Sequence, residues 1–190
     1  FIFKDDKYLL GKSDQSKDEF DILLFVRRDI NEISIPSNIK VISSYAFQYC
    51  YGLKKVEISL NSNLQIIESE SFTYTKIKKI LISSKITKIC NHAFSFCESL
   101  EKVEIPSNSD LQIIESLAFA QTRIKDFFVP SKVIKISRTA FTYCKSLQII
   151  EISEESKLES SNLHSFAGCE QLIIMIPSSF QRKYILFKKW

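Results

Sequence analysis

The chain has 190 residues, of which 45% are apolar and 25% are charged, which is enough apolar sequence to build one domain with a hydrophobic core. Its formal net charge of +4 is accounted for by four basic residues near the C-terminus, so the rest of the chain is neutral and a nucleic-acid-binding surface is not expected: Arg182, Lys183, Lys188 and Lys189. No window reaches the roughly 18 consecutive apolar residues of a membrane helix, and the start, Phe1 to Asp6, is neither an initiator Met nor a signal peptide. We therefore expect a fragment or processed chain that contacts a membrane only through an anchor elsewhere in a longer protein.

The first 29 residues are predicted to form an N-terminal cap. Two short apolar segments, Phe1 to Phe3 and Tyr8 to Leu10, flank the charged turn Lys4 to Lys7, and this pattern predicts a hairpin. The apolar run Ile22 to Val26 follows it. Because a repeat array exposes its core at both ends, these elements are expected to cover the first coil.

Residues 30–176 contain about six repeats, each marked by a phenylalanine. The spacings alternate between 25 and 22 residues, and the surrounding block reads I-x-x-I-x-x-x-A/S-F-x-x-C/T: Phe47, Phe72, Phe94, Phe119, Phe141 and Phe166. Such a fixed period is typical of units that bury their apolar face only by stacking on one another. The sequence therefore predicts a solenoid with one continuous core, in which the phenylalanines stack.

Each repeat is expected to contribute two short strands. The first has the alternating pattern L/I-x-x-V/I-x-I, as in Leu53 to Ile58, and the four prolines come just after it, where a missing N–H ends pairing: Pro36, Pro106, Pro130 and Pro177. The second strand precedes the phenylalanine and its tight turn, as in Ile86 to Phe94. Successive repeats run in the same direction, which predicts parallel sheets.

The last segment, 177–190, is predicted to be a C-terminal cap or a basic amphipathic tail. Phe180, Tyr184 and Phe187 follow the i, i+4, i+7 spacing of one helix face. A helix that covers the last coil is the favoured interpretation, with a membrane-surface helix as the alternative.

The cysteines fit a structural role better than a disulfide framework. Four of the five lie three residues after a repeat phenylalanine, where Thr75 and Thr122 occupy the alternate repeats: Cys50, Cys97, Cys144 and Cys169. Cysteines two coils apart are separated by roughly 10 Å, beyond disulfide reach. Only Cys144 and Cys169 lie in adjacent repeats and have the spacing for a bridge.

No catalytic or metal-binding motif is found. The two histidines, His92 and His164, are three repeats apart, about 14 Å along the stack, which excludes a shared metal or a catalytic dyad. With three glycines in the chain there is no phosphate-binding loop or nucleophile elbow. We expect no enzyme, no cofactor, no metal and no small-molecule substrate.

The candidate binding site is the outward row of the first strands, beside the inward Val or Ile. Its proposed members alternate along the repeats: Lys55, Glu57, Lys79, Leu81, Lys102, Glu104, Asp126 and Phe128. Leu81 and Phe128 are apolar where the pattern allows polar residues, and exposed aromatic residues among charges are typical of binding hot spots. The three lysines are expected to stack in one column, partly relieved by Glu57 and Glu104. A solvated sheet face without a partner is the alternative.

The pattern L-x-x-I-x-I-P-x-x-I-x-x-I-x-x-x-A-F-x-x-C, over Ile30 to Ile176, resembles the BspA-like leucine-rich repeats of bacterial and protozoan surface antigens. The resemblance implies a mainly-β, right-handed horseshoe with a parallel sheet on its concave face. It also implies adhesion or binding to a host or extracellular-matrix protein at the cell surface, without catalysis. The chain departs from the family pattern at Ser43, Cys90 and Ser137, where many members have glycine. The alternative function is an intracellular, cytoplasmic scaffold that uses the same solenoid.

Overall fold

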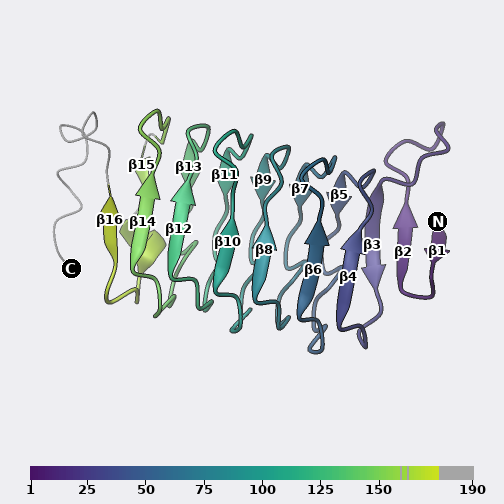
Figure 1. Ribbon diagram of the computed structural model, residues 1–190, viewed down its shortest axis with the longest axis horizontal. Coiled ribbons are helices and arrows are strands. Elements are labelled where there is room, and N and C mark those ends of the chain that lie inside the picture. Colours follow the sequence, from purple (N-terminus) through teal and green to yellow (C-terminus); the bar gives the residue numbers. More distant parts are fainter. Residues whose placement is uncertain (159, 162, 176–190) are drawn as a thin grey trace.

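The structure is a computed structural model that describes residues 1–158, 160–161 and 163–175. Within these ranges the chain forms a mainly-β parallel solenoid, in which each coil contributes one longer and one two-residue strand (Figure 1). The only helix of the described residues is the single-turn 3-10 helix Leu163–Phe166. The C-terminal segment predicted as a cap, with Pro177, lies outside the described residues.

The longer strands follow one another along one side of the stack. They are β4 (Glu32–Ile35), β6 (Lys55–Ile58), β8 (Lys79–Leu81), β10 (Lys102–Glu104), β12 (Asp126–Val129), β14 (Ile149–Ile152) and β16 (Ile173–Met175). They pair in parallel as β4-β6, β8-β10 and β12-β14-β16. We call the outward side of these strands the long-strand face. As predicted, Pro36 and Pro130 come directly after β4 and β12.

The short strands build a second, nine-stranded sheet on another side of the coils. It contains β5 (Val41–Ile42), β7 (Ile66–Ile67), β9 (Lys88–Ile89), β11 (Ile113–Ile114), β13 (Lys135–Ile136) and β15 (Ser160–Ser161), all parallel. The N-terminal strands continue this sheet in the order β1-β2-β3-β5: β1 (Ile2–Lys4), β2 (Tyr8–Gly11) and β3 (Ile22–Val26). The predicted hairpin is thus confirmed as β1 and β2, which pair antiparallel.

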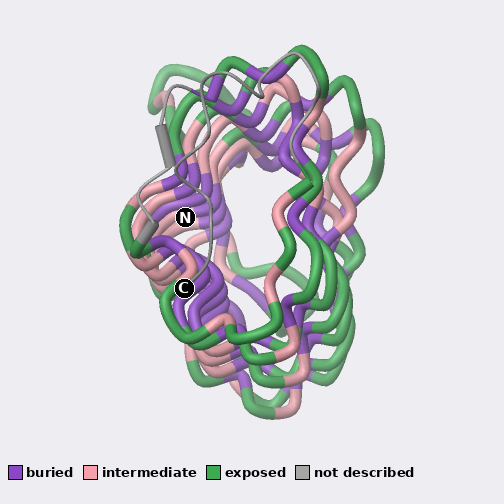
Figure 2. The backbone as a smooth tube through the Cα atoms, turned by 90° about the vertical axis from the view of Figure 1, so that its left-hand side faces the viewer, coloured by how far each residue is buried: buried purple, intermediate pink, exposed green. Residues whose placement is uncertain are grey.

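The core runs through the inside of the coils as rows of equivalent side chains. Seen along the stack, the coils superpose into one elongated ring with buried residues recurring at the same places (Figure 2). The repeat phenylalanines from Phe47 to Phe166 stack in one ladder, with centroids of successive rings 4.5, 5.0, 5.3, 5.2 and 5.6 Å apart. The first five are fully buried, which confirms the predicted core column.

The turns around each phenylalanine have an unusual backbone that the sequence pattern did not indicate. In five coils the residues two before and two after the phenylalanine have left-handed φ values, for example 63° at Tyr45 and 60° at Tyr49. A glycine is used only in the sixth turn, after Phe166, where Gly168 has φ of 77°. Non-glycine residues adopt this conformation at a steric cost, so tertiary contacts must hold these turns in place. Each of the first five repeat phenylalanines also donates its N–H to the next coil, as from Phe72 to the Ala93 carbonyl at 2.8 Å.

Candidate functional site

The long-strand face places the predicted site residues in two columns across the coils. Within the paired strands, Glu32 lies opposite Lys55 and Ser34 opposite Glu57, while Lys79 lies opposite Lys102. The same alternation of outward and inward residues continues in β12, where Asp126 lies opposite Ile149 and Phe128 lies opposite Glu151. Strand alternation therefore brings all eight predicted residues to one face, because side chains at i and i+2 point to the same side.

Each lysine of this face forms an ion pair with a neighbouring carboxylate. Lys55 Nζ lies 2.6 Å from Glu57, while Glu104 accepts from both Lys79 and Lys102, at 2.7 and 3.1 Å. The hydrogen bonds from Lys79 and Lys102 lower the pKa of Glu104, and those from Lys55 and then Ser34 lower the pKa of Glu57.

The long-strand face is therefore not a positive surface. In the described strands it carries three lysines against five carboxylates, counting the predicted residues together with Glu32 and Glu151. The relief expected from Glu57 and Glu104 reaches all three lysines, with Lys79 and Lys102 sharing one carboxylate, and the other acidic residues lie towards the two ends of the row.

The two apolar residues that the sequence singled out lie apart. Leu81 lies opposite Glu104, and Phe128 belongs to the next strand beyond, so a glutamate strand separates them. Both side chains are half-buried rather than exposed, because the neighbouring strands cover part of each. Leu81 and Phe128 therefore belong to the same face but are not cross-strand neighbours.

The long-strand face carries three further exposed apolar residues that were not selected as site residues from the sequence. Ile149, Ile173 and Met175 are 38%, 65% and 52% exposed. Ile173 lies opposite Ile149, and Met175 lies opposite Glu151, the partner of Phe128. We call Phe128, Ile149, Ile173 and Met175 the apolar patch. The sequence could have indicated them, because the alternation that places Ile149 and Glu151 on the outward side places Ile173 and Met175 there in the next strand.

Little in the described residues points to catalysis or metal binding. No group of three or more His, Cys, Asp or Glu side chains is placed to hold a metal ion in this part of the chain. Burial raises the pKa of Cys97 to about 12, and its Sγ donates to the Phe72 carbonyl at 3.0 Å, which makes the thiol unreactive. Cys144 and Cys169, the one pair with the spacing for a bridge, are both free thiols, and their Sγ atoms donate to the Phe119 and Phe141 carbonyls at 3.0 and 3.1 Å.

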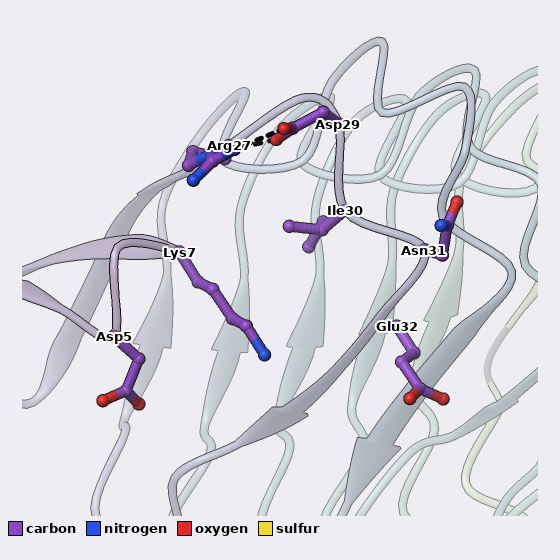
Figure 3. Close-up of a pocket in the computed structure, with 7 residues that line it drawn as sticks. All are labelled: Asp5, Lys7, Arg27, Asp29, Ile30, Asn31 and Glu32. Carbon is purple, nitrogen blue, oxygen red and sulfur yellow. Dashed lines mark hydrogen bonds and ion pairs between the residues drawn. The ribbon is translucent and has the colours of Figure 1, made fainter.

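An open hollow lies at the N-terminal end of the long-strand face (Figure 3). Its volume is about 410 Å³, and it is lined by the hairpin turn and the segment before β4: Asp5, Lys7, Arg27, Asp29, Ile30, Asn31 and Glu32. Arg27 and Asp29 form a bidentate ion pair within it. Three acidic and two basic side chains line this hollow, so it is mildly acidic.

Comparison with known proteins identifies the repeat. The chain matches the BspA type leucine rich repeat region over residues 21–148 and again over 112–185. The protein therefore belongs to the BspA-type leucine-rich repeat family. Repeats of this kind generally mediate protein–protein interaction. A search of curated protein sequences returned no match.

Solved structures share the fold. The pneumococcal vaccine antigen PcpA is 20% identical, with a TM-score of 0.58, covering 89% of this chain and 54% of its own. The leucine rich repeat protein of T. pallidum is 18% identical, with a TM-score of 0.57, covering 92% of this chain and 71% of its own. A leucine rich cell surface protein from Faecalibacterium prausnitzii is 26% identical, with a TM-score of 0.44, covering 80% of this chain and 55% of its own. The chain spans about half the length of the first and third of these proteins.

No helix of the described residues is long and apolar enough to cross a membrane.

Proposed function

We propose that this protein is a non-catalytic binding module that attaches a cell surface to a host or extracellular-matrix protein through the long-strand face. The observation that supports it best is the apolar patch, whose isoleucines and methionine stand exposed on paired strands of an otherwise charged face. Exposed apolar residues with polar neighbours are characteristic of protein-binding surfaces. The surface location is inferred from the family, whose members include surface antigens.

The chemistry of the patch indicates the kind of partner. Asp126 and Glu151 alternate with the apolar side chains, and the described residues give neither carboxylate an ion pair. A partner that inserts an apolar side chain and surrounds it with Lys or Arg would bury the patch and pair both carboxylates. Such paired charges favour association rate and specificity more than affinity.

The proposal predicts that Ile149→Asp weakens binding to the partner. Truncations at the centre of an interface typically cost about 2 kcal/mol or more, and here a charge would also enter the apolar patch. The assay is surface plasmon resonance against purified extracellular-matrix proteins, with Phe128→Ala as a second variant. Phe128 is half-buried, so its melting temperature must be measured alongside.

A matched control is available on another side of the coil. Ile134, just before β13, is 42% exposed, close to the 38% of Ile149. Ile134→Asp should leave binding unchanged. Equal losses in the two Asp variants, or none in either with unaltered melting, would move the site away from the long-strand face. Labelling of the full-length protein on intact cells tests the surface location separately.

A further inference from the structure

The two strand-bearing sides of the solenoid end at different positions at the N-terminus. The nine-stranded sheet continues past the first coil through β3, β2 and β1. The long-strand face stops at β4, which pairs with β6 on one side and is the edge strand of its sheet. The hollow lined by Lys7 and Glu32 lies between the hairpin turn and this edge, and Lys7 extends into it (Figure 3).

The backbone of β4 directs hydrogen-bonding groups into this open side. The N–H groups of Lys54 and Lys55 donate to the Asn31 carbonyl, at 2.8 and 3.3 Å, so Asn31 faces β6. In a parallel ladder alternate residues face the same neighbour, so Ile33 and Ile35 also face β6, whereas Glu32 and Ser34 face away. Outside the β4–β6 ladder, the backbone N–H and C=O groups of Glu32 and Ser34 take part in no backbone hydrogen bond within the described residues.

We propose that the free edge of β4 binds an extended segment of a partner protein as an added parallel strand. Edge strands with an unpaired row of N–H and C=O groups are templates for such pairing, and the added main-chain bonds give affinity while side-chain pockets give specificity. The hollow beside β4 leaves room for the segment, and its mildly acidic lining favours one that carries a basic side chain.

The strand on the other side of β4 defines which segment fits. In β6, Lys55 lies opposite Glu32, Val56 opposite Ile33 and Glu57 opposite Ser34, whose hydroxyl donates to Glu57 at 2.7 Å. A segment with the same order, basic, apolar and then polar, can pair with the free side of β4. Its basic residue then lies opposite Glu32, and its apolar residue lies opposite Ile33, on the side of the hollow lined by Ile30. The partner is therefore a chain with an exposed basic–apolar–polar–apolar stretch.

The probe that tests this is the acetylated hexapeptide LKKVEI, the sequence of residues 53–58. In the proposed register the N–H of its valine donates to the Glu32 carbonyl, and its valine carbonyl accepts from the Ser34 N–H. We expect saturable binding by fluorescence anisotropy and slowed hydrogen exchange at the Ser34 amide. The same peptide N-methylated at the valine, which lacks that N–H, should bind at least about tenfold more weakly.

Two variants of one residue separate the backbone group from the side chain. Ser34→Pro removes the N–H that faces the free edge, whereas Ser34→Ala removes only the hydroxyl bonded to Glu57. Peptide binding should fall about tenfold or more in Ser34→Pro and persist in Ser34→Ala. If Ser34→Pro does not fold, the N-methylated peptide still tests the proposal on the unmodified protein.

Unchanged binding of the N-methylated peptide, or protection confined to β16 or the nine-stranded sheet, would overturn the proposal. So would a dimer of the protein alone that Ser34→Pro abolishes, because the edge would then be taken by a second copy. Ile149→Asp, which tests the long-strand face, should leave peptide binding intact, so failure of either proposal is distinguishable from failure of the other.

Discussion

The phenylalanine ladder shows how much a residue depends on its position in the stack. Phe94 lies between Phe72 and Phe119, with ring centroids 5.0 and 5.3 Å away, and is fully buried. Phe166, in the last described coil, stacks on Phe141 at 5.6 Å and is only partly buried. The same side chain in the same repeat position therefore has two stacking partners in the centre and one at the end.

We predict that Phe94→Ala lowers the free energy of unfolding by about 3 to 5 kcal/mol, since it removes a buried ring and leaves a cavity between two others. Phe166→Ala should cost less. Denaturant melts of the two variants check this, with Ile134→Asp, on the surface, as the control. Equal losses would be inconsistent with one continuous stack.

At the scale of elements, Asp21 joins the N-terminal strands to the first coil. Its carboxylate is nearly fully buried, accepts from the N–H and hydroxyl of Ser13 at 2.8 and 2.5 Å, and lies 2.9 Å from Lys40 Nζ. Its backbone carbonyl accepts from the Lys40 N–H at 2.7 Å. Burial opposes ionisation, but the bonds from Ser13 and Lys40 outweigh it and lower the pKa of Asp21 to about 2.

This lowered pKa predicts a stability that depends on pH. Because the folded carboxyl binds its proton less readily than the unfolded one, the stabilisation is present above about pH 4 and is lost as the pH falls towards 2. It amounts to about 2 kcal/mol. Asp21→Asn should therefore be less stable than the wild type at pH 6, and the difference should vanish near pH 2. A constant difference across this range in urea melts would show that Asp21 acts by packing alone.

On the scale of the whole molecule, the solenoid is a one-dimensional array. Each coil contacts the coils before and after it, as the unbroken pairing order of the nine-stranded sheet shows. The stability of such arrays is the sum of repeat and nearest-neighbour terms, so the ends open more readily than the centre.

Amide hydrogen exchange should therefore be slowest in the central coils, from β8 to β11, and faster towards β16. Asp21→Asn should speed exchange in β1 to β3 and β5 and leave β10 to β13 unchanged, because the loss is confined to one end. Uniform acceleration along the chain would mean that the array unfolds as one cooperative unit.

The sequence by itself determined the periodic features: the phenylalanine column, the two strands of each coil, the hairpin and the side to which each strand residue points. These follow from the local alternation of strands and from the repeat, which need no knowledge of distant contacts. The tertiary structure decided what depends on neighbouring coils. Glu104 pairs with lysines of two coils, Phe128 adjoins Ile149 rather than Leu81, and the left-handed turns are held by stacking. The edge of β4 is free because the hairpin pairs with the nine-stranded sheet through β3. The hairpin could have continued either the nine-stranded sheet or the strand pair β4-β6, and no local sequence pattern encodes which.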